Sequence, residues 1–177
     1  MGMTRTVPLR DPVTIELIGW VQQSIERICG SVAGLTEAQV RQPAAPSGWT
    51  IAGLVGHIHD SSLFWLHNVI AGVPMTFNGD DEWNNDPEST MPQLLSRLRT
   101  DTARACDAIE QLAADAAPGW WPEGAWGGYR QETIRGVLLH LLYDNAAHTG
   151  HLDLARERID GGVWDYGRDA VRRPDQR

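Results

Sequence analysis

The segment LLHLLYDNAAHTGHLDLARE, residues 138–157, decides how the chain is expected to fold. It contains no proline and is rich in leucine, alanine, arginine and glutamate, which favour the α-helix. Polar residues nevertheless recur along it every three or four positions, namely His140, Asp144, His148 and His151. On a helical wheel these four side chains fall within an arc of about 80°. The same arc contains or adjoins apolar residues, so the polar stripe is expected to face the interior of the protein.

Three further amphipathic helices precede this segment, each bounded by residues that cap or break helices. The expected limits of the four are Pro12 to Gly30 or Gly34, Trp49-Thr50 to Gly72, Ser89 or Thr90 to Pro118, and about Glu132 to Ile159. Ile15 is expected in the buried stripe of the first helix, and Leu95 and Leu112 in that of the third. One or two helical turns are expected over 37–42, and connecting loops over 77–89 and 118–131.

This pattern predicts an all-α fold, a four-helix bundle with a short extra helical turn and long end loops. One domain is expected over residues 1–177, with a core over about 12–162 and a C-terminal tail, 163–177, that shows no clear pattern. No strand of useful length is expected.

Composition excludes several classes of function. The 177 residues carry a formal net charge of −8 and no basic block, which argues against nucleic acid and anionic membranes as partners. No apolar run approaches the roughly 20 residues of a membrane span, and a cytoplasmic protein is expected. Cys29 and Cys106 lie far apart and form no CxxC motif, so they are expected to be small core residues.

The polar stripe is expected to bind a metal ion. Asp144 and His148 stand one helical turn apart, so their side chains can converge on one cation. A third ligand has to come from another helix: His57 and His59 flank the apolar stripe of the second helix, and the wheel does not choose between them, whereas His67 points away. Two imidazoles and a carboxylate leave at least one coordination position open, as in catalytic sites. Zn(II) is the expected ion, with Ni(II), Fe(II), Mn(II) or Co(II) as alternatives.

The other polar and aromatic residues are given supporting roles. His140 and His151 are expected to orient a ligand or substrate from beside the metal, or to protonate it. Trp120, Trp121 and Trp126 lie in a Gly/Pro-rich loop that covers one end of the core or lines the mouth of the site, cover being favoured. Surface ion pairs are expected among Asp153, Arg156 and Glu157.

Two segments resemble the DinB/YfiT-like superfamily, in its mycothiol-transferase branch: SGWTIAGLVGHI, residues 47–58, and HLLYDNAAHTGHLDLARERIDG, residues 140–161. The former has the family's Trp-Thr pair, with the tryptophan eight residues before a ligand histidine. The latter is similar to the family's H-x3-E-x3-H-x2-H-x-D pattern, followed by Arg-Glu and a terminal Asp-Gly. The resemblance implies the DinB-like bundle and the metal ligands His57, Asp144 and His148, and it thereby favours His57 over His59.

The resemblance also implies the chemistry. Relatives use mycothiol or bacillithiol in S-transfer or in thiol-dependent isomerisation, and a metal suits such reactions because it lowers the pKa of a bound thiol. This sequence departs from the family pattern at three positions: Asp144 replaces a glutamate, Ala147 an arginine and Thr149 an asparagine. The missing arginine removes a side chain that could contact a substrate anion.

We therefore expect a metal-dependent transferase in which a mycothiol-like thiol attacks a small electrophile, or a thiol-dependent isomerase, acting as a homodimer. Two other hypotheses belong to different classes. One is a non-catalytic small-molecule-binding or dimerisation bundle with a degenerate metal site, and the other is a metal-dependent hydrolase that needs no thiol.

Overall fold

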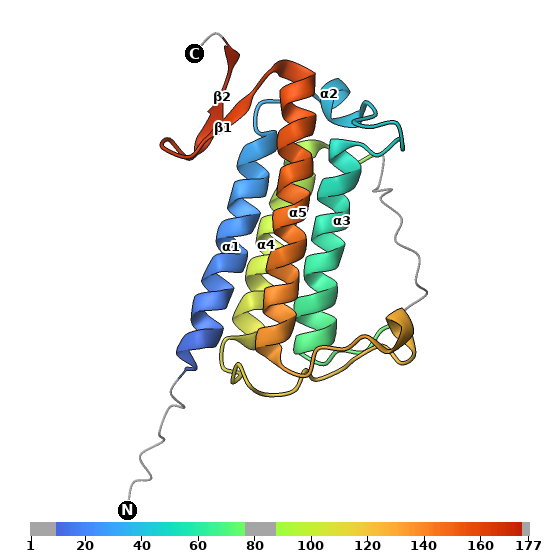
Figure 1. Ribbon diagram of the computed structural model, residues 1–177, viewed down its shortest axis with the longest axis vertical. Coiled ribbons are helices and arrows are strands. Elements are labelled where there is room, and N and C mark those ends of the chain that lie inside the picture. The colour runs from blue at the N-terminus through green and yellow to red at the C-terminus, as the bar shows by residue number, and fades with distance from the viewer. Residues whose placement is uncertain (1–9, 77–87, 175–177) are drawn as a thin grey trace, which may run out of the picture.

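The computed structural model describes residues 10–76 and 88–174, and four long helices form its body (Figure 1). These are α1 (Pro12–Val32), α3 (Ile51–Leu63), α4 (Met91–Ile109) and α5 (Ile134–Asp160). A π-helix, η1 (Phe64–Ile70), continues α3, a short helix, α2 (Glu37–Arg41), follows α1, and a 3-10 turn, η2 (Ala125–Gly128), precedes α5. The predicted all-α four-helix bundle is confirmed. Within the described ranges, no helix is long and apolar enough to cross a bilayer.

Most helix starts are set by capping residues that the sequence displays. Asp11 accepts a hydrogen bond from the N–H of Val13, and Pro12 occupies the first turn of α1. Thr50 and Thr133 cap α3 and α5 through bonds from the N–H groups of Gly53 and Gly136. The predicted starts therefore agree with the structure to within two residues.

In the bundle, α1 lies beside α5 and α3 lies beside α4, and α3 also faces α5 (Figure 1). Asn145 Nδ2 donates to Ser24 Oγ at 2.9 Å and Arg27 pairs with Asp153 at 2.6 Å, so α1 and α5 run in the same direction. Along the contacts between α3 and α5, the residue numbers rise on α3 while they fall on α5, so these two helices are antiparallel. α3 and α4 run in the same direction, because Leu54 and Leu98 lie in one apolar cluster, whereas Trp65 and Ala105, further along the chain in each case, lie in the other.

Two apolar clusters fill the bundle, and a polar layer lies between them. One cluster is built around Ile28, Leu54 and Leu98, and the other around Trp65 and Leu141. We call four polar residues, one chosen from each helix at the level between the two clusters, the central polar layer: Ser24, Ser62, Thr102 and Asn145. Among the described residues no hydrogen-bond partner is found for Ser62 Oγ, Thr102 Oγ1 or Asn145 Oδ1.

The structure corrects several expectations about element limits and burial. The third helix ends at Ile109, nine residues before Pro118, and Leu112 is half-buried in the following loop. Leu95 is also half-buried, and Ile15 is 37% exposed. The expected loop 77–89 lies mostly outside the described residues.

The C-terminal tail, predicted to lack pattern, forms a hairpin of β1 (Val163–Asp165) and β2 (Ala170–Arg172). The indole of Trp164 packs against Gly30 of α1, where an added Cβ would come within 2.8 Å of the ring. The guanidinium of Arg27 lies 3.8 Å above the same indole. The hairpin therefore joins the end of α5 to the end of α1.

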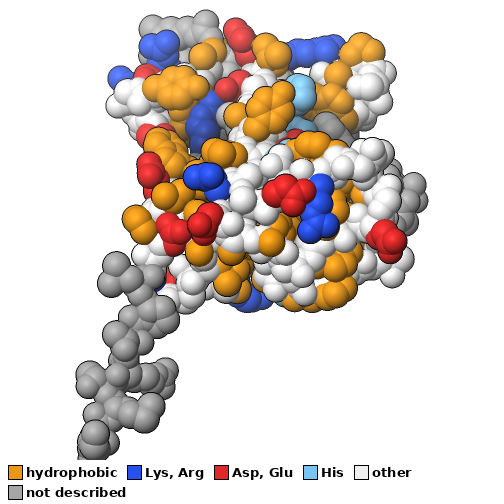
Figure 2. Space-filling view, turned by 60° about the horizontal axis from the view of Figure 1, so that its bottom comes forward, with side chains coloured by type: hydrophobic (Ala, Val, Ile, Leu, Met, Phe, Trp, Pro, Cys, Tyr) orange, Lys and Arg blue, Asp and Glu red, His pale blue; other side chains and the backbone are white. Residues whose placement is uncertain are grey.

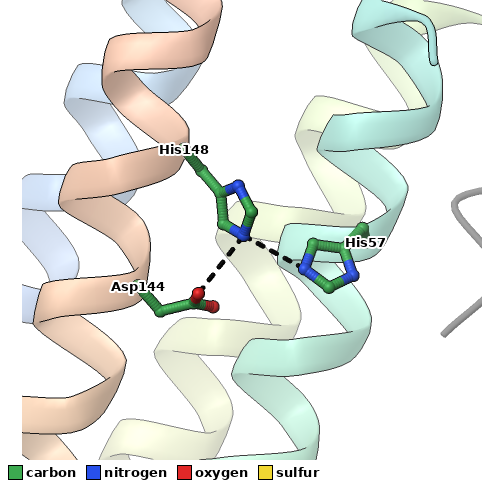
Figure 3. A group of neighbouring side chains, drawn as sticks. All are labelled: His57, Asp144 and His148. Carbon is green, nitrogen blue, oxygen red and sulfur yellow. Dashed lines mark hydrogen bonds and ion pairs between the residues drawn. The ribbon is translucent and has the colours of Figure 1, made fainter. Parts of the chain in front are cut away.

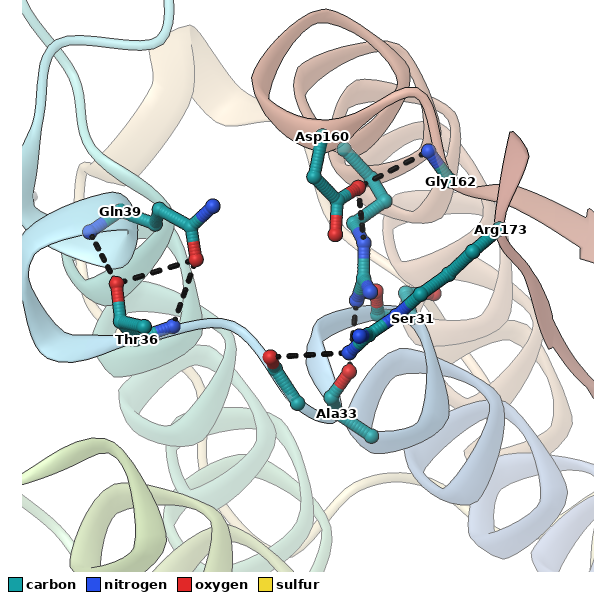
Figure 4. A network of polar contacts seen from close by, with 9 residues as sticks. Ser31, Ala33, Thr36, Gln39, Asp160, Gly162 and Arg173 are labelled. Carbon is teal, nitrogen blue, oxygen red and sulfur yellow. Dashed lines mark hydrogen bonds and ion pairs between the residues drawn. The ribbon is translucent and has the colours of Figure 1, made fainter. Parts of the chain in front are cut away.

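Arg156, predicted to lie in a surface ion pair, is 2% exposed and forms the centre of this junction, among the partners Ser31, Ala33 and Asp160 that are labelled in Figure 4. Its Nη1 donates to the carbonyls of Ser31 and Ala33, and its Nε to Asp160, all at 2.8 Å. It thus satisfies carbonyls at the C-terminal end of α1, which have no partner within the helix. Asp153, expected in the same pairing, instead binds Arg27.

Candidate metal centre

The site lies where α3 and α5 face each other, and its side chains are spaced one helical turn apart on both helices. Three cross-helix contacts follow one another along the gap, namely His57 to His148, Ser61 to Asp144 and Trp65 to His140. Because i and i+4 residues lie on one helical face, the antiparallel arrangement brings two such rows into register. Histidine side chains are visible at the surface beside hydrophobic ones in Figure 2.

His57, Asp144 and His148 converge on one point (Figure 3). The Nε2 atoms of His57 and His148 lie 3.1 Å apart, and His148 Nε2 lies 3.3 Å from Asp144 Oδ1. One ligand atom from each residue lies within 4.8 Å of the others. A tetrahedral ion with bonds of about 2.0–2.2 Å separates its ligand atoms by about 3.3–3.6 Å. The two imidazoles and the carboxylate therefore fit a zinc-like ion.

The three residues of the triad differ in how deeply they are buried. His148 is 6% exposed, whereas His57 and Asp144 are half-buried. Burial raises the pKa of Asp144, but the hydrogen bond and charge of His148 and the charges of His57 and His140 outweigh it and hold the pKa below its usual value. The carboxylate is therefore ionised at neutral pH, as a metal ligand has to be. The partial exposure leaves one side of the triad open for a further ligand.

The structure resolves the choice between the two histidines of the second helix. Both ring nitrogens of His59 are engaged away from the triad, Nδ1 by Asp60 at 2.9 Å and Nε2 by Asp101 of α4 at 3.0 Å. The hydrogen bond to Asp60 and that to Asp101 raise the pKa of His59 despite its burial. His67 is exposed, as predicted. His57 is thus the histidine of this helix that joins Asp144 and His148.

His140 and His151 lie on either side of the triad along α5 but not in it. His151 is exposed, and its ring lies 5.8 Å from that of His148 and 6.1 Å from that of Trp49. His140 is half-buried, 4.6 Å from the Trp65 ring, and its Nδ1 lies 3.3 Å from the hydroxyl of Tyr129. Burial lowers the pKa of His140, outweighing the nearby charge of Asp144. These contacts place both histidines beside the triad, and their roles there stay predictions.

The tryptophan loop crosses the end of the bundle where η1 ends and α5 begins (Figure 1). Trp120 packs on Phe64, and Trp121 and Trp126 pack on Trp65, with centroid distances of 6.2, 5.7 and 5.6 Å. The loop therefore covers the core, as favoured, and it also reaches His140 through Tyr129.

Three residues of this region were not predicted from the sequence. Ser61 donates to Asp144 Oδ2 at 3.3 Å, and its position one turn after His57 could have predicted that contact. Trp65, two turns after His57, was expected to be an ordinary core residue. Tyr129 is one of the aromatic residues of the expected loop 118–131, but its approach to His140 could not be predicted, because it depends on the course of that loop.

Neither cysteine of the chain is suited to act as a thiolate nucleophile at neutral pH. Both are buried, and burial raises the pKa of Cys29 to about 11 and that of Cys106 to about 12. A thiolate nucleophile at neutral pH would therefore have to come from another molecule.

The comparison with protein families agrees with this site. Residues 16–161 match the family model described as mycothiol-S-transferase. The chain belongs to this family. The matched range contains the whole triad, His140 and His151. Neither the curated proteins nor the solved structures that were compared include a match.

Proposed function

We propose that this member of the mycothiol-S-transferase family is a metal-dependent transferase. It joins the sulfur of a low-molecular-weight thiol, mycothiol or a close analogue, to a small electrophile, or uses the thiol in an isomerisation. The observation that carries the proposal is the convergence of His57, Asp144 and His148 within 4.8 Å in a partly open site. The family match supports the thiol as co-substrate.

In this proposal the three residues hold one divalent ion, with Zn(II) expected from the mixed nitrogen and oxygen ligands. When bound, such an ion supplies Lewis acidity that lowers the pKa of a thiol. The protein's own contribution is positional. Ser61 donates to the Asp144 carboxylate and so fixes its orientation, and His140 and His151, which flank the triad, orient or protonate the reactants in this proposal. The homodimer and the cytoplasmic location stay predictions.

Thiol consumption tests the proposal. Tag-free protein loaded with Zn(II) is mixed with mycothiol and a panel of electrophiles, and loss of free thiol is followed with product mass. The wild type should consume both reactants, and His148→Ala should reduce the rate at least about a hundredfold. His67→Ala, an exposed histidine from the same helical segment, is the matched control and should retain the rate.

Two results would contradict the proposal. One is a rate in the wild type no higher than that of His148→Ala for any electrophile tested. The other is consumption of the electrophile without any thiol, which would indicate a metal-dependent hydrolase.

A further inference from the structure

A closed circuit of ring side chains lies one helical turn from Asp144. Its members, which we call the aromatic circuit, are Trp65, Trp126, Trp121, Tyr129 and His140. Successive ring centroids lie 5.6, 5.8, 6.3, 5.9 and 4.6 Å apart, the last distance returning from His140 to Trp65. His140 stands one turn before Asp144 on α5, and Trp65 one turn after Ser61, which contacts Asp144. The circuit is therefore continuous with the candidate metal centre.

The circuit has a buried floor and an exposed rim. Trp65 is 7% exposed, whereas Trp126 and Tyr129 are 44% and 43% exposed. The Trp126 ring stacks on Trp65 at an interplanar angle of 28°. The flat ring of Trp126 thus covers the flat apolar face of Trp65, and an aromatic ligand can make the same contact with Trp65.

The backbone that holds Trp126 in this position is strained. Trp126 has φ 50° and ψ 37°, the left-handed region, which is unfavourable for a bulky side chain. Gly124, Gly127 and Gly128 also have positive φ, and no atom lies within 4 Å of a Cβ built at any of them. Ring contacts with Trp65, Trp121 and Phe64 hold Trp126 in this strained conformation. The flanking glycines have open space around them, so they can absorb the change in backbone angles that moves Trp126 away from Trp65.

The polar groups of the circuit suit an uncharged ligand with an oxygen acceptor. Tyr129 accepts from Gln131 Nε2, so its own O–H is available to donate to His140 or to a ligand. Burial lowers the pKa of His140, which favours the neutral ring. Arg130 lies 5.9 Å from the Trp121 centroid and is itself 3.9 Å from Glu132, so its charge is balanced.

We propose that the aromatic circuit binds the electrophile, and that this electrophile is a neutral, flat, conjugated carbonyl compound that enters between Trp65 and Trp126. The proposal rests on the proposed function, which it deepens by naming the substrate class. The carbonyl oxygen accepts from Tyr129 or His140, and the conjugated carbon points along the gap toward His57 and Asp144. Trp126 moves outward and closes over the second face of the ligand.

The reaction at such an acceptor balances without a leaving group. The thiol sulfur forms a bond to the β-carbon, and the π electron pair of the C=C bond moves toward the carbonyl as an enolate. The thiol proton is then delivered to the α-carbon. One thiol and one acceptor combine into one product, with no oxidant or reductant required, and a hydrogen bond at the carbonyl oxygen stabilises the charge that develops there.

Binding is measured by isothermal titration calorimetry in the absence of thiol, with benzylideneacetone and its matched non-aromatic analogue, ethylideneacetone. Benzylideneacetone should bind the wild type saturably and at least tenfold more tightly than ethylideneacetone. Trp126→Ala should weaken benzylideneacetone binding about three- to tenfold, the contribution of one aromatic pair. Trp126→Phe should restore most of it, and Trp20→Ala, an exposed tryptophan of α1, should change nothing.

Absence of saturable binding, or equal affinity of wild type and Trp126→Ala, would overturn the assignment. The thiol assay separates this failure from failure of the proposed function. If thiol is consumed equally fast with both ketones, the transferase stands and the aromatic site is wrong. If benzylideneacetone binds as expected but no electrophile consumes thiol, the binding site stands and the transferase does not.

Discussion

At the scale of single residues, Asp144 determines how the candidate metal centre is assembled. Its carboxylate lies 3.3 Å from His148 on its own helix and 3.3 Å from the Ser61 hydroxyl on α3. The side chain is one methylene shorter than the glutamate that the family resemblance implies. The contacts show that it nevertheless reaches the point on which the two imidazoles converge.

Substitution of Asp144 should therefore separate charge from length. Asp144→Asn removes the negative charge and should weaken Zn(II) binding at least about tenfold, whereas Asp144→Glu keeps the carboxylate and should stay within about tenfold of the wild type. Competition with a chromophoric chelator measures both affinities. Equal affinity of Asp144→Asn and wild type would show that the carboxylate is not a ligand.

The two cysteines provide a further test at this scale. With the pKa of Cys29 raised to about 11, roughly one thiol in a thousand is ionised at pH 8, and fewer at Cys106. Alkylation of the native protein by iodoacetamide should be slower than that of the urea-unfolded chain by at least about a hundredfold, as followed by mass spectrometry. The double variant Cys29→Ala, Cys106→Ala should keep its transferase rate, and loss of that rate in a folded variant would show that a protein thiol takes part.

At the scale of the elements, the structure shows which parts of the fold local sequence determines. The starts of α1 and α3 followed from Asp11-Pro12 and Trp49-Thr50, because a capping bond joins neighbours along the chain. The hairpin over 163–172 could not be predicted, because strands of three residues are too short to show an alternation of apolar and polar residues. The burial of Arg156 depends on carbonyls of Ser31 and Ala33, more than a hundred residues away, so only the packed bundle reveals it.

The candidate site, too, could be predicted from the sequence only in part. The spacing of Asp144 and His148 predicted their pairing, because one helix carries both. Spacing alone could not choose between His57 and His59, since that choice depends on which face α3 turns to α5 and which to Asp101 of α4. The aromatic circuit could not be predicted, because it depends on the course of a loop whose sequence has no periodicity.

The central polar layer gives a prediction about the helices as packed units. Thr102 is 1% exposed, and its hydroxyl has no hydrogen-bond partner among the described residues. Thr102→Val keeps the shape and removes the unsatisfied group, so the free energy of unfolding should rise by about 1 kcal/mol. Urea denaturation measures the change, with the exposed Thr100→Val as control. A decrease of similar size would show instead that a buried water satisfies the hydroxyl.

At the scale of the whole molecule, the first and last helices are joined at one end by the hairpin and by the bonds that Arg156 donates to the carbonyls of Ser31 and Ala33. Burial raises the pKa of Asp160, but the hydrogen bonds from Arg156 and from the N–H of Gly162, with the charges of Arg156 and Arg173, outweigh burial and hold the pKa below its usual value. A depressed carboxyl pKa stabilises the fold above the unfolded value, and the contribution is lost as the pH falls through the folded value.

Asp160→Asn should therefore cost about 2 kcal/mol or more of unfolding free energy at pH 7, because Arg156 would keep its charge in a buried position. The difference between variant and wild type should shrink as the pH is lowered from about 5 to 2, since the wild-type carboxyl is protonated over that range. Urea titrations at several pH values measure it. A difference that is independent of pH would mean that the charge of Asp160 does not stabilise the junction.

The proposed chemistry depends above all on one metal ion held by His57, Asp144 and His148. Elemental mass spectrometry of tag-free protein should be run beside His57→Ala, His148→Ala and the control His67→Ala, with circular dichroism to verify that each variant is helical. We expect about one transition metal per chain in the wild type and in His67→Ala, and almost none in the other two. A wild type that contains no metal and takes up neither Zn(II) nor Ni(II) would contradict the assignment, as would a metal content that His57→Ala and His148→Ala leave unchanged.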